Sequence, residues 1–192
     1  MIDAVEILSR VCALIAKGDQ AAAEGTINRD YPFVSMLPTL RGYSEAVATR
    51  IFVRDGFLER YTGERLVFPG ALRLLSLKLP KAFPYHRNWK MSETHPAFWQ
   101  LYATIDHVDP VACGALDVET NLVTTSMIRN SAKANSPLEK LGWQLRPIER
   151  LAGWDGLTGW FLSSVSAEPS LLEHPFIKRW YGAAKRTRSI PR

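Results

Sequence analysis

The chain has little cysteine and no long apolar run, and each absence excludes a class of protein. Its 192 residues include only two cysteines, Cys12 and Cys113, which form no C-x-x-C pair. A disulfide framework is therefore not expected, and both thiols should be free. No run of 18 apolar residues occurs, and the first turns carry Asp3, Glu6 and Arg10, so neither a membrane span nor a secretory signal fits. We expect a cytoplasmic protein without a membrane partner.

The composition that is present suits a single hydrophobic core with a mild basic excess. The chain is 46% hydrophobic and carries a formal net charge of +5, and its length is enough for one core. The excess charge gathers at the C-terminus, in Lys178, Arg179, Lys185, Arg186, Arg188 and Arg192. Such a distribution favours a polyanionic partner without requiring one.

Hydrophobic spacing predicts helices at both ends of the chain. An apolar stripe over residues 5–15 predicts a helix that stops at Lys17-Gly18, and an Ala-rich turn over 20–24 should end at Gly25. We expect residues 1–42 to form a helical N-terminal extension. Residues 143–192 contain four tryptophans, Trp143, Trp154, Trp160 and Trp180. They predict a helical cap that buries aromatic rings and ends in a basic tail.

Between these extensions, residues 43–142 are expected to form the core, with an insertion at 64–103. Ser44 is a suitable N-cap for a helix over 45–54, which Asp55-Gly56 should break. The insertion should hold one helix near 71–79, a loop and a second helix over 96–103, which leads into an apolar strand.

Three short segments carry the strongest functional signal. In order they are Thr104-Ile105-Asp106-His107-Val108-Asp109-Pro110, Asn121-Leu122-Val123 and Arg129-Asn130-Ser131-Ala132-Lys133. Asn121 follows His107 by 14 positions (121 − 107), and Asn130 follows it by 23 (130 − 107). This pattern resembles the HNH family of metal-dependent nucleases, whose signature reads Asp-His-(Val/Ile)-x-Pro, Asn-Leu-Val and Asn-x-x-Lys. The resemblance implies an α+β fold with a ββα-metal, treble-clef-like core.

The resemblance also implies an endonuclease that hydrolyses DNA phosphodiester bonds with Mg²⁺ or a similar divalent ion such as Mn²⁺. Hydrolysis needs an activated water and a counter-charge for the phosphate. His107 would be the general base, because imidazole is well matched to accept a proton near neutral pH. Asp106 and Asn130 would offer one anionic and one neutral oxygen to the ion, which leaves positions for water and phosphate.

The neighbouring residues would have supporting roles. Asn121 would complete the catalytic set by holding the loop and the histidine strand in place through backbone hydrogen bonds. Arg129 and Lys133 would face the phosphate backbone of double-stranded DNA. One metal site cuts one strand per engagement, so double-strand cleavage would need a homodimer or two events.

The segment over residues 54–66 resembles the zinc knuckle that opens many HNH domains, but its ligands are missing. The four cysteine positions of the family are occupied here by Glu59, Thr62, Ser126 and Arg129. No structural zinc is therefore expected. We expect Glu59 and Arg129 to converge as an ion pair, with hydroxyl hydrogen bonds from Thr62 and Ser126.

Two other functions stay open. The ββα fold could be a nucleic-acid-binding module that has lost its chemistry, or the enzyme could be an RNase or a toxin nuclease. The sequence does not define the target, any dependence on base modification, or a role such as restriction or phage defence. His86, His95 and His174 lie beside prolines and aromatics, a setting more typical of packing than of ligation.

Overall fold

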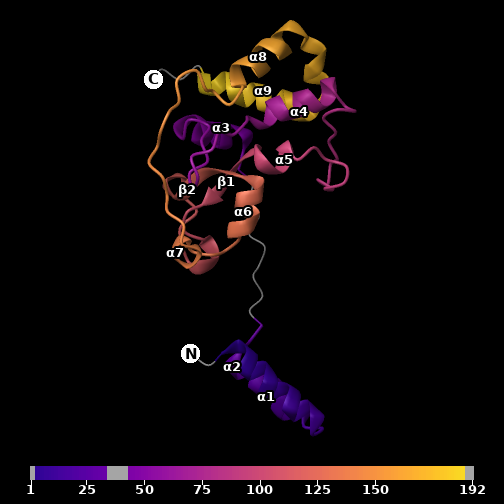
Figure 1. Cartoon of the computed structure of the whole chain (residues 1–192), viewed down its shortest axis with the longest axis vertical. Helices are drawn as coiled ribbons and strands as arrows, with labels where there is room; N and C mark the ends of the chain where they lie inside the picture. The colour runs from indigo at the N-terminus through magenta and orange to yellow at the C-terminus, as the bar shows by residue number, and fades with distance from the viewer. Residues whose placement is uncertain (1–2, 34–42, 189–192) are drawn as a thin grey trace. The chain divides into compact units, whose positions relative to one another are not determined.

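A computed structural model of the chain describes residues 3–33 and 43–188 (Figure 1). Its internal contacts divide the chain into two compact units, Met1–Leu40 and Arg41–Arg192. The first unit is a helical pair, and the second combines helices with a two-stranded antiparallel sheet. The predicted α+β class is therefore confirmed at this level. No helix within the described ranges is long and apolar enough to cross a membrane.

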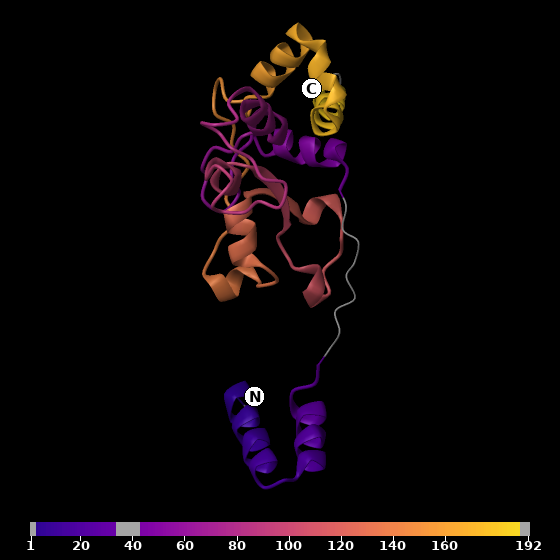
Figure 2. The same cartoon turned by 90° about the vertical axis from the view of Figure 1, so that its right-hand side faces the viewer.

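The first unit consists of α1 (Ala4–Ala16) and α2 (Gln20–Asp30), which pack side by side (Figure 2). The helix α1 follows the prediction, and Ile7 and Val11 supply its buried face. The predicted end of α2 at Gly25 is wrong, because the helix continues to Asp30. A glycine in a helix costs only about 1 kcal/mol, and Arg10 reaches the far end of α2 to pair with Asp30 at 2.6 Å.

The second unit begins with α3 (Glu45–Arg54), whose bounds match the prediction. The Ser44 hydroxyl accepts a hydrogen bond from Val47 N at 3.3 Å and caps the helix. After Gly56 the chain forms a narrow turn closed by a bridge between Leu58 and Arg65. This turn occupies the place of the predicted knuckle.

The insertion contains one full helix, α4 (Pro69–Lys78), and one short helix, α5 (Ala97–Gln100). The predicted helix over 96–103 is therefore too long. Tyr102 pairs in parallel with Val67, and Ala103 already belongs to the sheet. The apolar pattern continues past Gln100, but the helix ends there because the next residues pair with the segment around Val67.

The sheet consists of β1 (Ala103–His107) and β2 (Leu122–Ser126), which run antiparallel with His107 opposite Leu122. The connecting loop contains two short 3₁₀ turns, η1 (Val111–Cys113) and η2 (Glu119–Asn121). The helix α6 (Met127–Lys133) follows β2 directly and packs on both strands. The short α7 (Leu138–Leu141) ends at Gly142.

The C-terminal part supplies α8 (Thr158–Ala167), the turn η3 (Pro169–Glu173) and α9 (Pro175–Arg188). These elements pack with α3 and α4 (Figures 1 and 2). Their core is aromatic, and Phe52, Phe68, Phe98, Phe161 and Trp180 are all buried. The expected burial of all four C-terminal tryptophans is wrong for Trp160, which is 41% exposed.

Candidate active site

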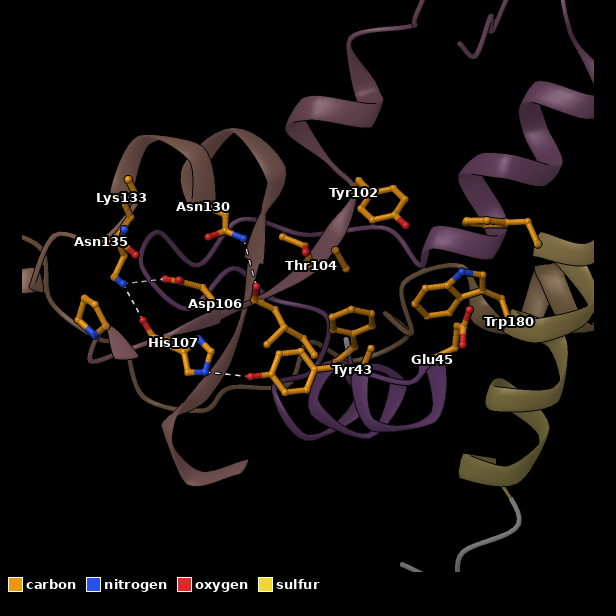
Figure 3. A pocket seen from close by; sticks show the side chains of 17 residues that line it. Tyr43, Glu45, Tyr102, Thr104, Asp106, His107, Asn130, Lys133, Asn135 and Trp180 are labelled. Carbon is orange, nitrogen blue, oxygen red and sulfur yellow. Dashed lines mark hydrogen bonds and ion pairs between the residues drawn. The ribbon is translucent and has the colours of Figure 1, made fainter. Parts of the chain in front are cut away.

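A cavity of about 620 Å³ runs along β1 and collects four of the predicted site residues. Asp106 and His107 reach it from the end of β1, and Asn130 and Lys133 reach it from α6 (Figure 3). Its volume lies within the range of small-molecule sites. Residues that the sequence separates by 27 positions (133 − 106) thus border one space.

The imidazole of His107 is fixed by two side chains that the sequence did not indicate. Its Nε2 lies 2.9 Å from the Tyr43 hydroxyl and 2.9 Å from Asp117 Oδ1. The Tyr43 hydroxyl also donates to the same carboxylate oxygen. Within the described residues, Nδ1 of His107 has no hydrogen-bond partner. The contacts therefore orient the ring and leave one nitrogen for another group.

No local pattern could have revealed both of these partners. Tyr43 lies 64 positions before His107 and comes beside it only because α3 packs against β1. Asp117 lies in the loop between the strands, 10 positions after His107. An acidic residue in that loop is a visible signal, but the path of an irregular loop is not readable from its sequence.

Asp106 is held by a hydroxyl and an ammonium group. Its Oδ2 accepts a hydrogen bond from Tyr61 at 2.5 Å and lies 3.1 Å from Lys133 Nζ. Burial first, and then the Asp106 carboxylate, raise the pKa of Tyr61, so its hydroxyl stays a donor. Lys133 Nζ also donates to the backbone oxygen of His107 at 2.6 Å. Both residues at the end of β1 are therefore tied to α6.

The prediction that Lys133 faces a phosphate backbone is wrong. Its side chain is 1% exposed, and its ammonium is occupied by Asp106 and by the backbone of His107. Such pairing offsets the desolvation of a buried ammonium. In this structure Lys133 supports the site from inside.

Asn130 offers an oxygen toward the same space. Its Nδ2 donates to Ile105 O at 3.1 Å, which fixes the orientation of the amide. Neither Asn130 Oδ1 nor Asp106 Oδ1 has a hydrogen-bond partner within residues 3–33 and 43–188. One carboxylate and one amide oxygen fit a hard cation that keeps several of its waters. In the same described part of the chain, no three His, Cys, Asp or Glu side chains gather as a metal site.

Asn121 makes the loop contacts that were predicted for it. Its Oδ1 accepts from Asp109 N at 2.9 Å, and its Nδ2 donates to Asp109 O at 2.9 Å and to Leu116 O at 3.0 Å. The amide therefore closes the loop that carries Asp117. A contribution of Asn121 to catalysis stays a prediction.

The corner that takes the place of a zinc knuckle consists of Glu59, Thr62, Thr125 and Arg129. It surrounds the buried carboxylate of Glu59. Glu59 is 1% exposed and accepts hydrogen bonds from Thr62 and Thr125, both at 2.9 Å. Arg129 Nε lies 3.8 Å from Glu59 Oε2, so the predicted convergence is confirmed. Burial raises the pKa of Glu59 against the opposing effects of the two hydroxyls and of Arg129. The predicted hydrogen bond from Ser126 is wrong, because Ser126 caps α6 by accepting from Arg129 N.

Arg129 also contacts an aromatic ring on the outer side of the same corner. Its guanidinium lies 4.9 Å from the ring centre of Trp143, and its side chain is 36% exposed. The two residues line a second pocket of about 320 Å³ together with Arg146. Contact of Arg129 with phosphate is compatible with this exposure and stays a prediction.

Of the other histidines, His95 and His174 lie in packing environments, and His86 Nε2 lies 3.9 Å from Glu93 Oε2. His95 stacks on Phe83 with ring centres 4.1 Å apart, and His174 Nε2 lies 3.3 Å from Arg73. Burial, followed by the charge of Arg73, lowers the pKa of His174. Cys12 and Cys113 are both free and exposed, as predicted.

Comparisons of the chain with protein-family models, with curated proteins and with solved structures gave no match.

Proposed function

We propose that the chain is a metal-dependent endonuclease with a ββα-metal core that hydrolyses phosphodiester bonds in DNA. The main support is the orientation of His107 by Tyr43 and Asp117 at a cavity that Asp106 and Asn130 also line. An imidazole fixed through one nitrogen, beside a carboxylate and an amide oxygen, supplies the kinds of group that phosphodiester hydrolysis needs. The order of β1, β2 and α6 agrees with the family that the sequence resembles.

In the proposed reaction His107 acts as the general base. Its free ring nitrogen takes a proton from a water molecule, whose oxygen attacks phosphorus in line with the 3′ oxygen. The bond between phosphorus and that oxygen breaks, and the departing oxygen takes a proton from solvent. The products are a 5′-phosphate and a 3′-hydroxyl. Asp117 and Tyr43 keep the ring in one orientation. The Asp117 carboxylate also lies beside the ring when the ring carries the extra proton.

Asp106 and Asn130 would hold one Mg²⁺ or similar ion. When bound, such an ion supplies counter-charge for the phosphate oxygens and for the leaving oxygen. Asn130 keeps its amide oxygen available because its nitrogen is bound to Ile105 O. Asp106 offers one oxygen, Oδ1, since Oδ2 accepts from Tyr61 and is paired with the Lys133 ammonium.

One observation favours a second function, a nucleic-acid-binding module without chemistry. The Lys133 ammonium lies where it balances the charge of Asp106 without any metal. A module of this kind would bind DNA through Arg129 and the exposed basic residues of α9, and His107 would be a structural residue.

A cleavage assay separates the two functions. Supercoiled plasmid is incubated with the wild-type protein in Mg²⁺, in Mn²⁺ and in EDTA, beside His107→Ala. Ion-dependent nicking by the wild type, with loss of nicking in the variant, is the expected result. DNA binding without ion-dependent nicking would leave the binding module as the function.

A further inference from the structure

The cavity extends well beyond the predicted catalytic residues. Figure 3 shows Tyr102, Glu45 and Trp180 at the end away from Lys133, with Thr104 between the two ends. We propose that this end is a nucleobase subsite, which takes the base of the nucleotide beside the scissile phosphate. The proposal rests on the proposed nuclease function and specifies its substrate.

Three polar groups at this end are available to a ligand. Within the described residues, no hydrogen bond is made by the Tyr102 hydroxyl, the Thr104 hydroxyl or the Trp180 indole N–H. None of the three is among the fully buried polar atoms that lack a partner, so each opens onto the cavity, where water or a ligand can pair with it. A ligand that carries acceptors is one such partner.

Glu45 supplies the complementary acceptor. Its Oε1 accepts from Arg179 Nε at 2.6 Å, and Oε2 has no hydrogen-bond partner among the residues described. Burial is the main reason that the pKa of Tyr102 is raised, followed by the neighbouring Tyr85 and then by the Glu45 carboxylate. Tyr102 is therefore a neutral donor on the same side as an anionic acceptor.

The apolar lining fits a flat ring. Phe52 and Phe176 border the cavity beside the small side chains of Ala48 and Ala103. The exposed lining of the whole cavity is more polar than apolar, so hydrogen bonds would fix a ligand whose flat face lies against these apolar side chains. A nucleobase has this combination of a planar apolar face and a polar edge.

The polar groups also favour particular bases. A carboxylate accepts from an exocyclic amino group, and hydroxyl or indole donors pair with a carbonyl oxygen. Cytosine and guanine carry both groups, whereas adenine lacks the carbonyl and thymine lacks the amino group. A base enters such a recess only when it leaves the stack, so single-stranded DNA or a flipped nucleotide is the form recognised.

If the Tyr102 hydroxyl binds the base, its removal should matter only when the base is present. A short single-stranded oligonucleotide with a mapped cleavage site is compared with one that is abasic beside the scissile bond. Tyr102→Phe should lower kcat/KM on the intact strand by about fivefold and leave the abasic strand unaffected. Tyr181→Phe, which removes a hydroxyl outside the cavity, is the matched control and should change neither. An equal loss on both strands in Tyr102→Phe would overturn the proposal.

Glu45→Gln tests the preference for an amino group. The variant should reduce the preference for cytosine and guanine over thymine at the position beside the cut. Arg179→Gln breaks the same ion pair but keeps the carboxylate, so its preference should match the wild type. Equal loss of preference in both variants would show that the carboxylate does not recognise the base.

Direct binding separates a failure of the subsite from a failure of the nuclease function. Binding of dCMP, dGMP, dAMP and dTMP is followed by tryptophan fluorescence, and again with the same bases in oligonucleotides. Weaker dCMP or dGMP binding to Tyr102→Phe supports the subsite even if no cleavage is found. Tighter binding of the oligonucleotides would indicate a polynucleotide rather than a free nucleotide as the source of the base. Cleavage that is independent of the neighbouring base, without nucleotide binding, would overturn the subsite and leave the nuclease intact.

Discussion

The ammonium of Lys133 lies 3.1 Å from Asp106 Oδ2 and 2.6 Å from the backbone oxygen of His107. The two contacts tie the end of β1 to the end of α6, so the predicted base and one predicted metal ligand share a buried support. They also place a positive charge beside the carboxylate that would bind a cation. The Lys133 ammonium would therefore oppose the proposed binding of an ion at Asp106, and this opposition can be measured.

Lys133→Met should bind Mn²⁺ more tightly than the wild type, because the carboxylate of Asp106 loses its competing cation. The same change should lower the free energy of unfolding by about 3 kcal/mol, since it breaks a buried pair from one side. Calorimetric titration and chemical denaturation measure the two effects, with the exposed Lys140→Met as control. Unchanged or weaker Mn²⁺ binding in a folded Lys133→Met would show that the lysine does not compete with the ion.

Asp117→Asn and Tyr43→Phe should each lower kcat about tenfold or more with little change in KM, because both side chains orient His107. The exposed loop variant Asp109→Asn controls for general disturbance of the loop. Steady-state cleavage of a defined oligonucleotide gives the two constants. A rise in KM with kcat unchanged would mean that the two residues contact substrate instead.

Glu59→Gln tests the cost of the buried carboxylate. Burial raises the pKa of Glu59 in the folded state, so the folded protein holds this proton more tightly than the unfolded chain. Stability from this group is therefore fully present below the unfolded pKa and is lost as the pH rises through the folded pKa. The unfolding free energy of the wild type, relative to that of Glu59→Gln, should increase as the pH is lowered from about 7 to about 5. A difference that is constant or opposite in sign would contradict this account.

Glu59→Ala should be destabilising at both pH values. It leaves the hydroxyls of Thr62 and Thr125 without their acceptor, at a cost of roughly 1–3 kcal/mol. Arg129→Ala should lower the unfolding free energy by less, because the Arg129 side chain is 36% exposed and its Nε lies 3.8 Å from Glu59 Oε2. Denaturant titration of the two variants and of their combination gives the coupling. Additivity would show that the ion pair contributes nothing.

Arg129→Gln should lower the slope of log K against log salt for DNA binding by about one unit, because one phosphate contact would be lost. Arg87→Gln, at an exposed position in the insertion, is the control. Fluorescence anisotropy at several salt concentrations measures both. An unchanged slope for Arg129→Gln would remove it from the DNA contacts.

The sequence predicted those parts of the molecule that depend on local patterns. The helix over 45–54 has a capping serine and a breaking Asp-Gly pair, and the structure begins and ends it at these residues. The spacing among Asp106, His107 and Asn130 reflects a strand, a loop, a second strand and a helix, and all three side chains line one cavity. Convergence of Glu59 and Arg129 followed from the family pattern, although Thr125 rather than Ser126 completes the corner.

The contacts that orient the candidate site residues were not local. Tyr43 and Tyr61 reach His107 and Asp106 across 64 and 45 positions, and no periodicity connects them. The burial of Lys133 was missed because α6 has only seven residues, too few to show which face is inward. The other end of the cavity was missed for a different reason: Glu45 and Trp180 belong to α3 and α9, which are far apart in the sequence and come together only because the two helices pack.

We propose His107 as the general base of a phosphodiester hydrolysis. The most direct test of this proposal is the single-turnover cleavage rate of His107→Ala against the wild type in Mg²⁺, with melting temperatures and DNA affinities measured in parallel. His86→Ala, at a histidine outside the cavity, is the control. The account predicts a loss of about 10²–10⁴-fold for His107→Ala with folding and affinity retained. A residual rate within about tenfold of the wild type would contradict it.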